Sequence, residues 1–253
     1  MRKICAYFIS LAVILPWNQA FGQKEPKLPD TVDIPLKIRA WIEVAGPVIY
    51  LTDKNNLSCE GYLSADLNEK IGVFAGGGYA NYKYSQYNYD YLSSGKYFKA
   101  GVDFNLMKPE KSIGKYWAGI GIHYGLSSYL TEVPAFSHEN YWGKITSSIS
   151  EQKRIGHFIE FAPGFRAEIF KGFTIGWAVT LRKLISAGTG KDLSPIFLPG
   201  YGTGNKSLST GINYFLIFSF KYKTIKVEVK PEPVDETEEG ATPPTQGGTT
   251  ISR

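Results

Sequence analysis

Strict alternation of apolar and polar residues is the feature of this chain that most constrains its fold. In the clearest run, residues 98–106, apolar side chains alternate with Lys99, Gly101, Asp103 and Asn105. Successive side chains of a β-strand point to opposite faces of a sheet, so this run predicts a strand with one apolar face and one polar or small face. Residues 118–127, 159–169 and 173–182 repeat the pattern.

Four weaker runs bring the predicted number of strands to eight. They are residues 37–50, 57–67, 70–84 and 210–222. Gly46-Pro47 breaks the first of these runs, and we interpret the break as a bulge or kink. Phe215 and Ile217 interrupt the polar face of the last run.

The predicted connections separate into two classes. Residues 68–70 and 170–172 are tight turns and residues 107–115 form a modest connection, whereas residues 85–94, 131–153 and 186–207 form longer loops, together with the short segment 52–56. Strand parity places the two classes at opposite ends of the sheet. Short turns at one end and longer loops at the other are typical of outer-membrane barrels.

Alternation alone fits a membrane barrel, with its apolar face outward, and a soluble barrel of the lipocalin type, with its apolar face inward. Three features favour the membrane barrel. Many runs reach the ten residues that a tilted strand needs to cross a bilayer, aromatic residues gather at strand ends, and glycines gather on the polar face. We therefore predict an all-β fold, an eight-stranded antiparallel transmembrane up-and-down β-barrel, present as a monomer.

The N-terminus predicts export. Basic Met1-Arg2-Lys3 precedes an apolar run over residues 4–17, and Ala20-Phe21-Gly22 offers a cleavage site. We predict four parts: a cleaved signal peptide over residues 1–22, a periplasmic N-terminal arm over 23–36, an outer-membrane barrel over 37–223, and a disordered periplasmic tail over 224–253. The tail is rich in Pro and acidic residues.

The chain resembles the small outer-membrane β-barrels, with the architecture of the transmembrane domain of outer membrane protein A. The resemblance rests on the signal peptide, the eight amphipathic strands, the alternating connection lengths and the aromatic strand end of residues 214–220. The motif of residues 101–106 also resembles uncharacterised barrel families of the Bacteroidota. The resemblance implies insertion by the barrel-assembly machinery into lipid and lipopolysaccharide. In one departure from it, 31 residues follow the last aromatic strand.

The polar strand faces carry a mixed set of charges that a barrel would enclose. These candidate lumen residues are Arg39, Glu43, Glu60, Asp66, Asp103, Glu160, Arg166, Glu168, Arg182 and Lys221. Charges removed from water must pair, because an unpaired buried charge is costly. We interpret the set as a salt-bridge network that fills the lumen; the alternative is a narrow gated channel in which the pairs exchange partners. Eight strands do not enclose a wide pore.

A lipid-modifying outer-membrane enzyme is the other alternative. Nucleophilic catalysis in such an enzyme needs a Ser beside a His. The chain has three His, of which His123 lies on a polar strand face. Ser127 is four residues along the same strand, too far for direct contact. A site formed across strands by His157 with Ser127 or Ser128 stays open. Residue spacing predicts no metal, no cofactor and no nucleic-acid partner.

Aromatic residues in the longer connections are candidates for binding an unidentified extracellular ligand, because Tyr offers a rigid surface with a polar tip. They are Tyr87, Tyr89 and Tyr91 in one connection and Phe136, Tyr141 and Trp142 in the next. The sequence therefore predicts an outer-membrane barrel with a structural or interaction role and no defined catalytic activity.

Overall fold

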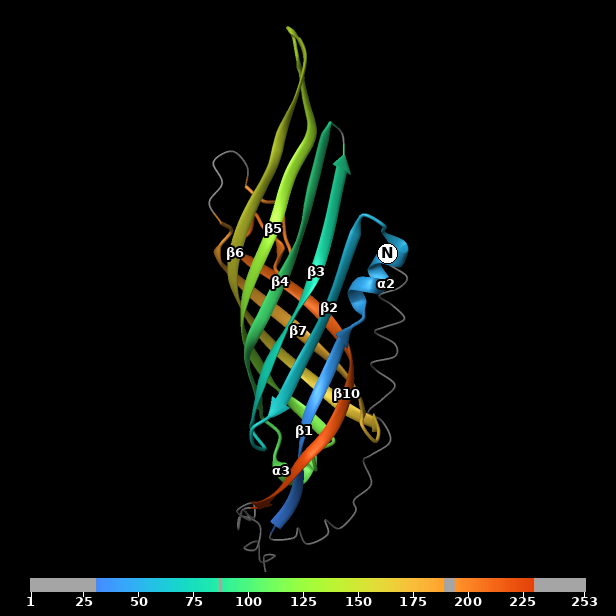
Figure 1. The fold of residues 1–253 in the computed structure, drawn as a ribbon, viewed down its shortest axis with the longest axis vertical. Helices are drawn as coiled ribbons and strands as arrows, with labels where there is room; N and C mark the ends of the chain where they lie inside the picture. Colours follow the sequence, from blue (N-terminus) through green and yellow to red (C-terminus); the bar gives the residue numbers. More distant parts are fainter. Residues whose placement is uncertain (1–30, 87, 189–193, 230–253) are drawn as a thin grey trace, which may run out of the picture. The chain divides into compact units, whose positions relative to one another are not determined.

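The computed structural model describes residues 31–86, 88–188 and 194–229, which form one closed β-barrel (Figure 1). Each strand pairs with its neighbours in antiparallel fashion, and β1 closes the barrel against β10. The barrel strands are β1 (Thr31–Glu43), β2 (Asn56–Asp66), β3 (Ile71–Gln86), β4 (Tyr89–Asn105), β5 (Tyr116–Asn140), β6 (Gly143–Phe170), β7 (Phe173–Ser186) and β10 (Leu208–Glu228). The predicted all-β fold, an eight-stranded antiparallel up-and-down barrel, is confirmed.

Four short elements accompany the barrel. Helix α2 (Ala45–Thr52) follows β1, and helix α3 (Pro109–Ser112) lies between β4 and β5. Strands β8 (Phe197–Leu198) and β9 (Gly202–Thr203) form a separate two-stranded sheet between β7 and β10. Among the described residues, no helix has the length and apolar character that crossing a membrane would require.

The register of the strands sets their tilt. A path that follows paired residues from strand to strand starts at Arg39 of β1, passes once around the barrel and reaches β10 at Ser209. The direct partner of Arg39 on β10 is Ser219, ten residues further along the strand. Closing eight strands with such an offset makes them run at roughly 40° to the barrel axis. The same offset decides which side chains meet across the lumen.

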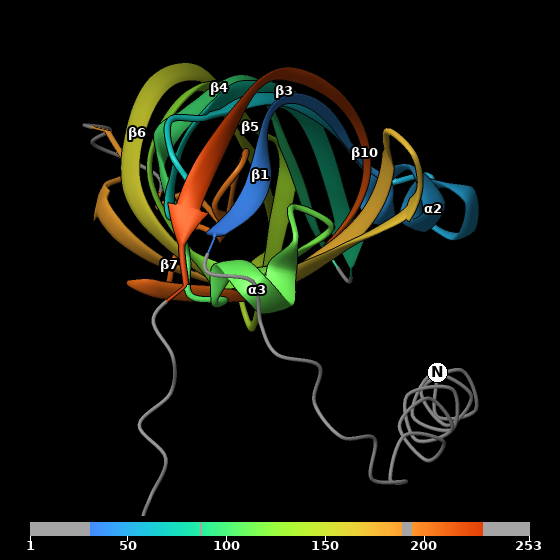
Figure 2. The same cartoon turned by 90° about the horizontal axis from the view of Figure 1, so that it is seen from below.

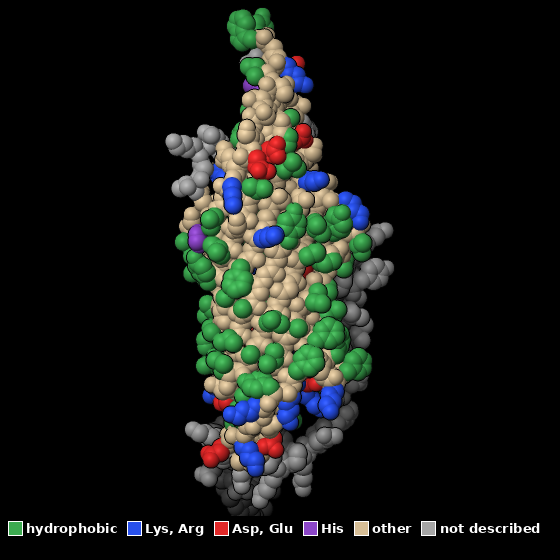
Figure 3. All heavy atoms as spheres, viewed as in Figure 1, with side chains coloured by type: hydrophobic (Ala, Val, Ile, Leu, Met, Phe, Trp, Pro, Cys, Tyr) green, Lys and Arg blue, Asp and Glu red, His purple; other side chains and the backbone are tan. Residues whose placement is uncertain are grey.

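The apolar face of the strands points outward. Large apolar side chains of the alternating runs, such as Ile122, Ile159 and Ile175, are exposed, while their polar neighbours are buried in the lumen. Figure 3 shows hydrophobic side chains over the barrel wall, with charged side chains gathered below them. This facing is the one that a membrane-spanning barrel requires.

The two ends of the barrel carry different connections, but their lengths do not divide as predicted, because 87–88 and 141–142 at the loop end are two-residue connections. The turn end holds the connections 67–70, 106–115 and 171–172, and α3 lies there (Figure 2). Thr31 and Glu228 pair at this end too. The loop end holds the connections 44–55, 87–88, 141–142 and 187–207.

Strand pairing continues beyond the predicted barrel bounds of 37–223. Thr31 to Leu36 pair with Glu228 to Lys223, so part of the predicted arm and of the predicted tail is strand. Backbone hydrogen bonding between two adjacent segments extends a ladder without needing a lipid-facing pattern. The predicted signal peptide, residues 23–30 of the arm and residues 230–253 of the tail lie outside the described residues.

Two predicted loops are instead strand. β3 and β4 continue almost to Asn88, and β5 and β6 continue to the turn at Tyr141 and Trp142. We call residues 83–86 with 88–90 the β3–β4 ribbon and residues 134–149 the β5–β6 ribbon (Figure 1). Because neither face of a projecting ribbon packs on a core, its sequence carries no clear apolar period. The predicted bulge at Gly46-Pro47 is wrong, since both residues lie in α2.

Candidate functional site

The centre of the lumen is occupied by Glu160 of β6 and the cations around it. Its Oε2 lies 2.7 Å from Arg182 Nε and 3.0 Å from Lys99 Nζ. Its Oε1 lies 3.0 Å from His123 Nδ1. Lys99 Nζ also lies 3.6 Å from Glu60. All of these side chains are buried, so each relies on protein partners in place of water.

Asp103 of β4 extends the network toward the turn end. Its Oδ1 lies 3.1 Å from His123 Nε2, and its Oδ2 accepts a hydrogen bond from Arg166 Nη2 at 2.6 Å. The Arg166 guanidinium lies between the rings of Trp41 and Trp117, 4.0 Å and 3.6 Å from their centroids. The three carboxylates of Glu60, Asp103 and Glu160 therefore balance the cations of Lys99, Arg166 and Arg182.

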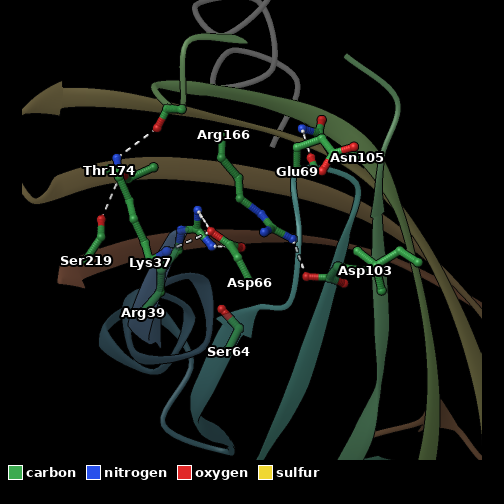
Figure 4. A network of polar contacts seen from close by, with 12 residues as sticks. Lys37, Arg39, Ser64, Asp66, Glu69, Asp103, Asn105, Arg166, Thr174 and Ser219 are labelled. Carbon is green, nitrogen blue, oxygen red and sulfur yellow. Dashed lines mark hydrogen bonds and ion pairs between the residues drawn. The ribbon is translucent and has the colours of Figure 1, made fainter. Parts of the chain in front are cut away.

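A second group of charges closes the lumen nearer the turn end (Figure 4). Arg39 is paired with Asp66, and Lys37 with Glu168. Lys37 Nζ also donates to the Gly114 carbonyl at 2.8 Å, which ties β1 to the connection before β5. These pairs are again balanced in charge.

An aromatic cluster fills the lumen between the charges. It consists of Trp41, Tyr62, Phe74, Phe215 and Ile217. Phe74 stacks on His123 with 4.2 Å between ring centroids. This cluster explains why Phe215 and Ile217 interrupt the polar face of β10, because they are the inward side chains that meet the rings of β1, β2 and β3.

The lumen leaves little free space. A cavity of about 30 Å³ remains around His123 and Glu160, and one of about 50 Å³ around Arg39 and Asp66. A bound water needs at least about 10–15 Å³, so these cavities have room for only a few water molecules. The arrangement resembles a packed polar core more than an ion path.

Residues 194–204, which we call the plug, close the lumen at the loop end. Leu198 and Tyr201 are fully buried against Tyr129 and Phe158. The Tyr91 hydroxyl accepts a hydrogen bond from Ile196 N at 3.1 Å and contacts the Phe197 carbonyl at 3.3 Å. Burial raises the pKa of Tyr201, whose hydroxyl donates to the Lys206 carbonyl at 2.7 Å.

The structure places most of the predicted lumen residues in ion pairs. Those that pair are Arg39, Glu60, Asp66, Asp103, Glu160, Arg166, Glu168 and Arg182. Glu43 is buried too, but its carboxylate accepts hydrogen bonds from the backbone N–H groups of Ala45 and Gly46, at 2.8 Å each. Lys221 is exposed on β10, opposite Lys37, and forms no ion pair within the described part of the chain.

Three network residues were absent from the predicted set. They are Lys37, Lys99 and His123. Parity could have found Lys99 and His123, because both stand on the polar faces of the two clearest alternating runs. Lys37 lies at the predicted barrel boundary, where the alternation begins and carries little information.

An open cleft of about 690 Å³ is lined by residues of both ribbons and by Ile196 and Asn205, and we call it the ribbon cleft. Tyr84, Tyr89 and Phe136 supply its aromatic surface, with His138 and Gln86 beside them. Tyr89 and Phe136 face each other across the β4–β5 ladder, and the Tyr84 and Tyr89 rings meet edge to face at 6.4 Å.

The predicted ligand-binding aromatics therefore separate. Tyr89 and Phe136 line the ribbon cleft, whereas Tyr141 and Trp142 stand 93% and 89% exposed at the tip of the β5–β6 ribbon. Tyr91 is fully buried against the plug, so its side chain is not available to a ligand. Tyr87 lies outside the described residues.

The cross-strand catalytic arrangement is absent from the described residues. His157 Nδ1 lies 2.6 Å from the Tyr124 hydroxyl on the outward face, while Ser127 is buried on the lumen side. Both ring nitrogens of His123 face carboxylates rather than a serine. Within residues 31–86, 88–188 and 194–229, no group of His, Cys, Asp and Glu is arranged to hold a metal ion.

A family model described as a domain of unknown function (DUF6048) matches residues 4–222. No curated protein matches the chain. Solved structures with similarity include the N-terminal β-barrel domain of Pseudomonas aeruginosa OprF, at 9% identity over 76% of this chain and 98% of that one, with a TM-score of 0.31. Acinetobacter baumannii CarO2 has 15% identity over 74% and 99%, with a TM-score of 0.38. Neisserial surface protein A has 12% identity over 77% and 98%, with a TM-score of 0.34.

Proposed function

The chain belongs to the family described as a domain of unknown function (DUF6048), and we propose a function for it. We propose that it is a sealed outer-membrane β-barrel that binds an extracellular ligand in the ribbon cleft. The proposal has three parts: the location, the closed lumen and the binding surface. Each part rests on a different set of residues.

The outward apolar belt supports a membrane location. Soluble monomers rarely expose contiguous apolar patches larger than a few hundred Å², whereas here large apolar side chains are exposed on all eight barrel strands. A closed barrel also satisfies backbone groups that would be costly to leave unpaired in lipid. The predicted signal peptide and the short connections of the turn end favour the outer membrane, with the turn end in the periplasm.

The packed lumen supports a sealed barrel rather than a channel. Ion pairs engage most of the charged side chains that line the lumen, and the aromatic cluster lies across the lumen between them. The plug covers the loop end above them. Ion passage would require these contacts to separate together.

The ribbon cleft is the single observation that carries the binding role. Its volume of about 690 Å³ falls in the range of small-molecule sites, about 300–1,000 Å³. Flat Tyr and Phe rings beside amide and imidazole groups suit a ligand with apolar faces and many hydroxyls. We therefore propose an oligosaccharide as the ligand class.

The test is binding of the purified full chain, in detergent, to an array of defined oligosaccharides. Tyr89→Ala removes a cleft ring, and Tyr116→Ala removes a half-exposed ring at the turn end as the matched control. We expect the wild type and Tyr116→Ala to retain the same oligosaccharides and Tyr89→Ala to lose them. Retention of no oligosaccharide by the wild type, or equal retention by Tyr89→Ala, contradicts the proposal.

The alternatives have their own readouts. In planar bilayers we expect no steady conductance from the wild type; well-resolved channel openings would favour the gated channel. With lipid A as substrate we expect an unchanged acyl pattern by mass spectrometry, and a changed pattern would favour the lipid-modifying enzyme.

A further inference from the structure

The barrel wall has a gap beside α2. Strand β1 ends at Glu43, opposite Phe215 of β10, and one more bond joins Val44 N to the Tyr214 carbonyl at 3.0 Å. On its other side, β1 pairs with β2 as far as Ile42 and Gly61. β10 continues to Leu208 paired with β7, and β2 continues to Asn56 paired with β3. Within the described chain, these two strand segments therefore face each other without a strand between them.

Helix α2 stands outside the ring of strands at this gap (Figure 2). Its first turn is fixed against β2, because Gly46 packs so closely on the Ser58 carbonyl that a Cβ would clash with it. The Glu43 carboxylate holds the same turn through its bonds to Ala45 and Gly46. Packing and hydrogen bonds therefore fix the first turn of α2 beside the gap.

The gap lies at the height of the apolar belt. Ile212 of β10 points outward and is 58% exposed, and Leu51 of α2 is 71% exposed. Residues 45–52 contain no charged side chain. Unpaired backbone groups beside hydrocarbon are unfavourable, so a hydrogen-bonding occupant of this gap would be stabilising.

A cavity of about 170 Å³ runs through the gap. Its inner lining includes Arg182 and Glu60, which belong to the lumen network, and its outer lining includes Ile212 and Ile49. The cavity is therefore lined both by side chains of the lumen network and by side chains that face outward.

We propose that this gap is a lateral binding site for a membrane amphiphile whose head group is an amine. The apolar tail lies along α2 and β10, and the head group enters the cavity. This site is separate from the ribbon cleft; it rests on the membrane location in the proposed function but not on the binding of an extracellular ligand.

The lining sets the chemistry of the head group. Glu43 and Glu60 both line the cavity, and each carboxylate oxygen can accept more than one hydrogen bond. The cation beside them, Arg182, is already engaged by Glu160 at 2.7 Å and by Asn213 Oδ1 at 3.3 Å.

Glu60 already lies 3.6 Å from Lys99 Nζ and accepts from the Tyr62 hydroxyl. Glu43 accepts only from backbone N–H groups and forms no ion pair within the described residues. An ammonium, with three donors and a positive charge, is the group that complements this carboxylate.

The experiment uses the full chain in phosphatidylcholine vesicles with a twelve-carbon alkylamine that carries a photoreactive diazirine in its tail. Ser58→Leu places a larger apolar side chain in the cavity. Ser128→Leu makes the same change on the exposed outward face of β5. Gly211→Leu is a second filling variant at another point of the lining, and retarded migration of unboiled protein on a denaturing gel identifies the variants that fold.

After irradiation and peptide mapping, we expect labelling concentrated in residues 45–52 and 208–214. It should fall about tenfold in the folded filling variants and stay unchanged in Ser128→Leu. The chain-matched carboxylic acid should label these segments no more than the rest of the barrel. Even labelling around the barrel, full labelling of the filling variants, or equal labelling by amine and acid overturns the proposal.

Discussion

The turn-end half and the loop-end half of the barrel are built from the same strands but are stabilised differently. In the turn-end half, the eight barrel strands form a closed ring of ladders and the enclosed charges pair with one another. In the loop-end half, β1 stops at Glu43, two ribbons project, and the plug fills the opening. In the turn-end half, the closed ring of strands and the paired charges allow a polar interior. The loop-end half depends instead on the packing of the plug, which is a connection between strands.

This difference between the two halves predicts where a substitution should have a large effect on folding and stability. A side chain in the closed half is constrained by lipid on one face and by the packed lumen on the other. A side chain in a ribbon meets water on both faces. The same chemical change should therefore have a large effect in one half and a small effect in the other.

The largest effect is expected for Glu160→Ala in the lumen. The change leaves Lys99, Arg182 and His123 without their shared partner, and breaking a buried ion pair costs about 3–5 kcal/mol. Urea titration of protein folded into vesicles measures the loss in the free energy of unfolding. The matched change Glu139→Ala, on the exposed β5–β6 ribbon, should stay within about 0.5 kcal/mol. Equal losses in the two variants would remove the distinction between the halves.

A charge on the outward face gives the next effect. Ile122→Arg places a cation in the apolar belt, where an arginine costs about 2–4 kcal/mol near the bilayer midplane. We expect less folded protein in vesicles, measured by migration of unboiled samples on a denaturing gel. Ile145→Arg, on an exposed part of the β5–β6 ribbon, should fold like the wild type. If Ile122→Arg folded equally well, the outward face would not meet lipid.

The plug should respond more weakly. Tyr91→Phe removes the hydroxyl that binds the backbone at Ile196 and Phe197, a loss of about 1 kcal/mol. We expect faster limited digestion by trypsin at Lys206, just beyond the plug, with the barrel still intact. Tyr141→Phe at the ribbon tip is the control and should leave the digestion rate unchanged. An unchanged rate in Tyr91→Phe would mean that other contacts hold the plug.

The smallest effect is expected from shortening the β5–β6 ribbon. Replacing residues 137–147 with an Asn-Gly turn removes segments that pair mainly with each other. Because the barrel ladders below are untouched, the temperature at which the folded gel band disappears should not change measurably. A clear fall would show that the ribbon supports the closed half.

Much of the fold follows from local pattern. The period of two places Asp103 and Glu160 inward and Ile122 outward, because neighbouring strand residues point to opposite faces whatever lies across the barrel. Strand parity likewise assigns each connection to one end of the barrel or the other. Eight of the ten predicted lumen residues form ion pairs for this reason.

Other features lay beyond that pattern. The ribbons have solvent on both faces, so they carry no apolar period, and α2 occupies a segment whose Val48 and Ile49 equally suit a strand. The plug depends on Tyr91 and Tyr129 from distant strands, and its own sequence does not reveal that it folds inward.

The alternation of residues is enough to predict the direction in which each side chain points, and with it the eight-stranded amphipathic barrel. Which partners meet is visible only in the folded barrel: Glu160 contacts Lys99, Arg182 and His123, and β1 ends before its neighbours and leaves a gap beside α2. The physical reason is that side-chain direction is set within one strand, whereas the partner across the lumen depends on the accumulated register of all eight strands when the barrel closes.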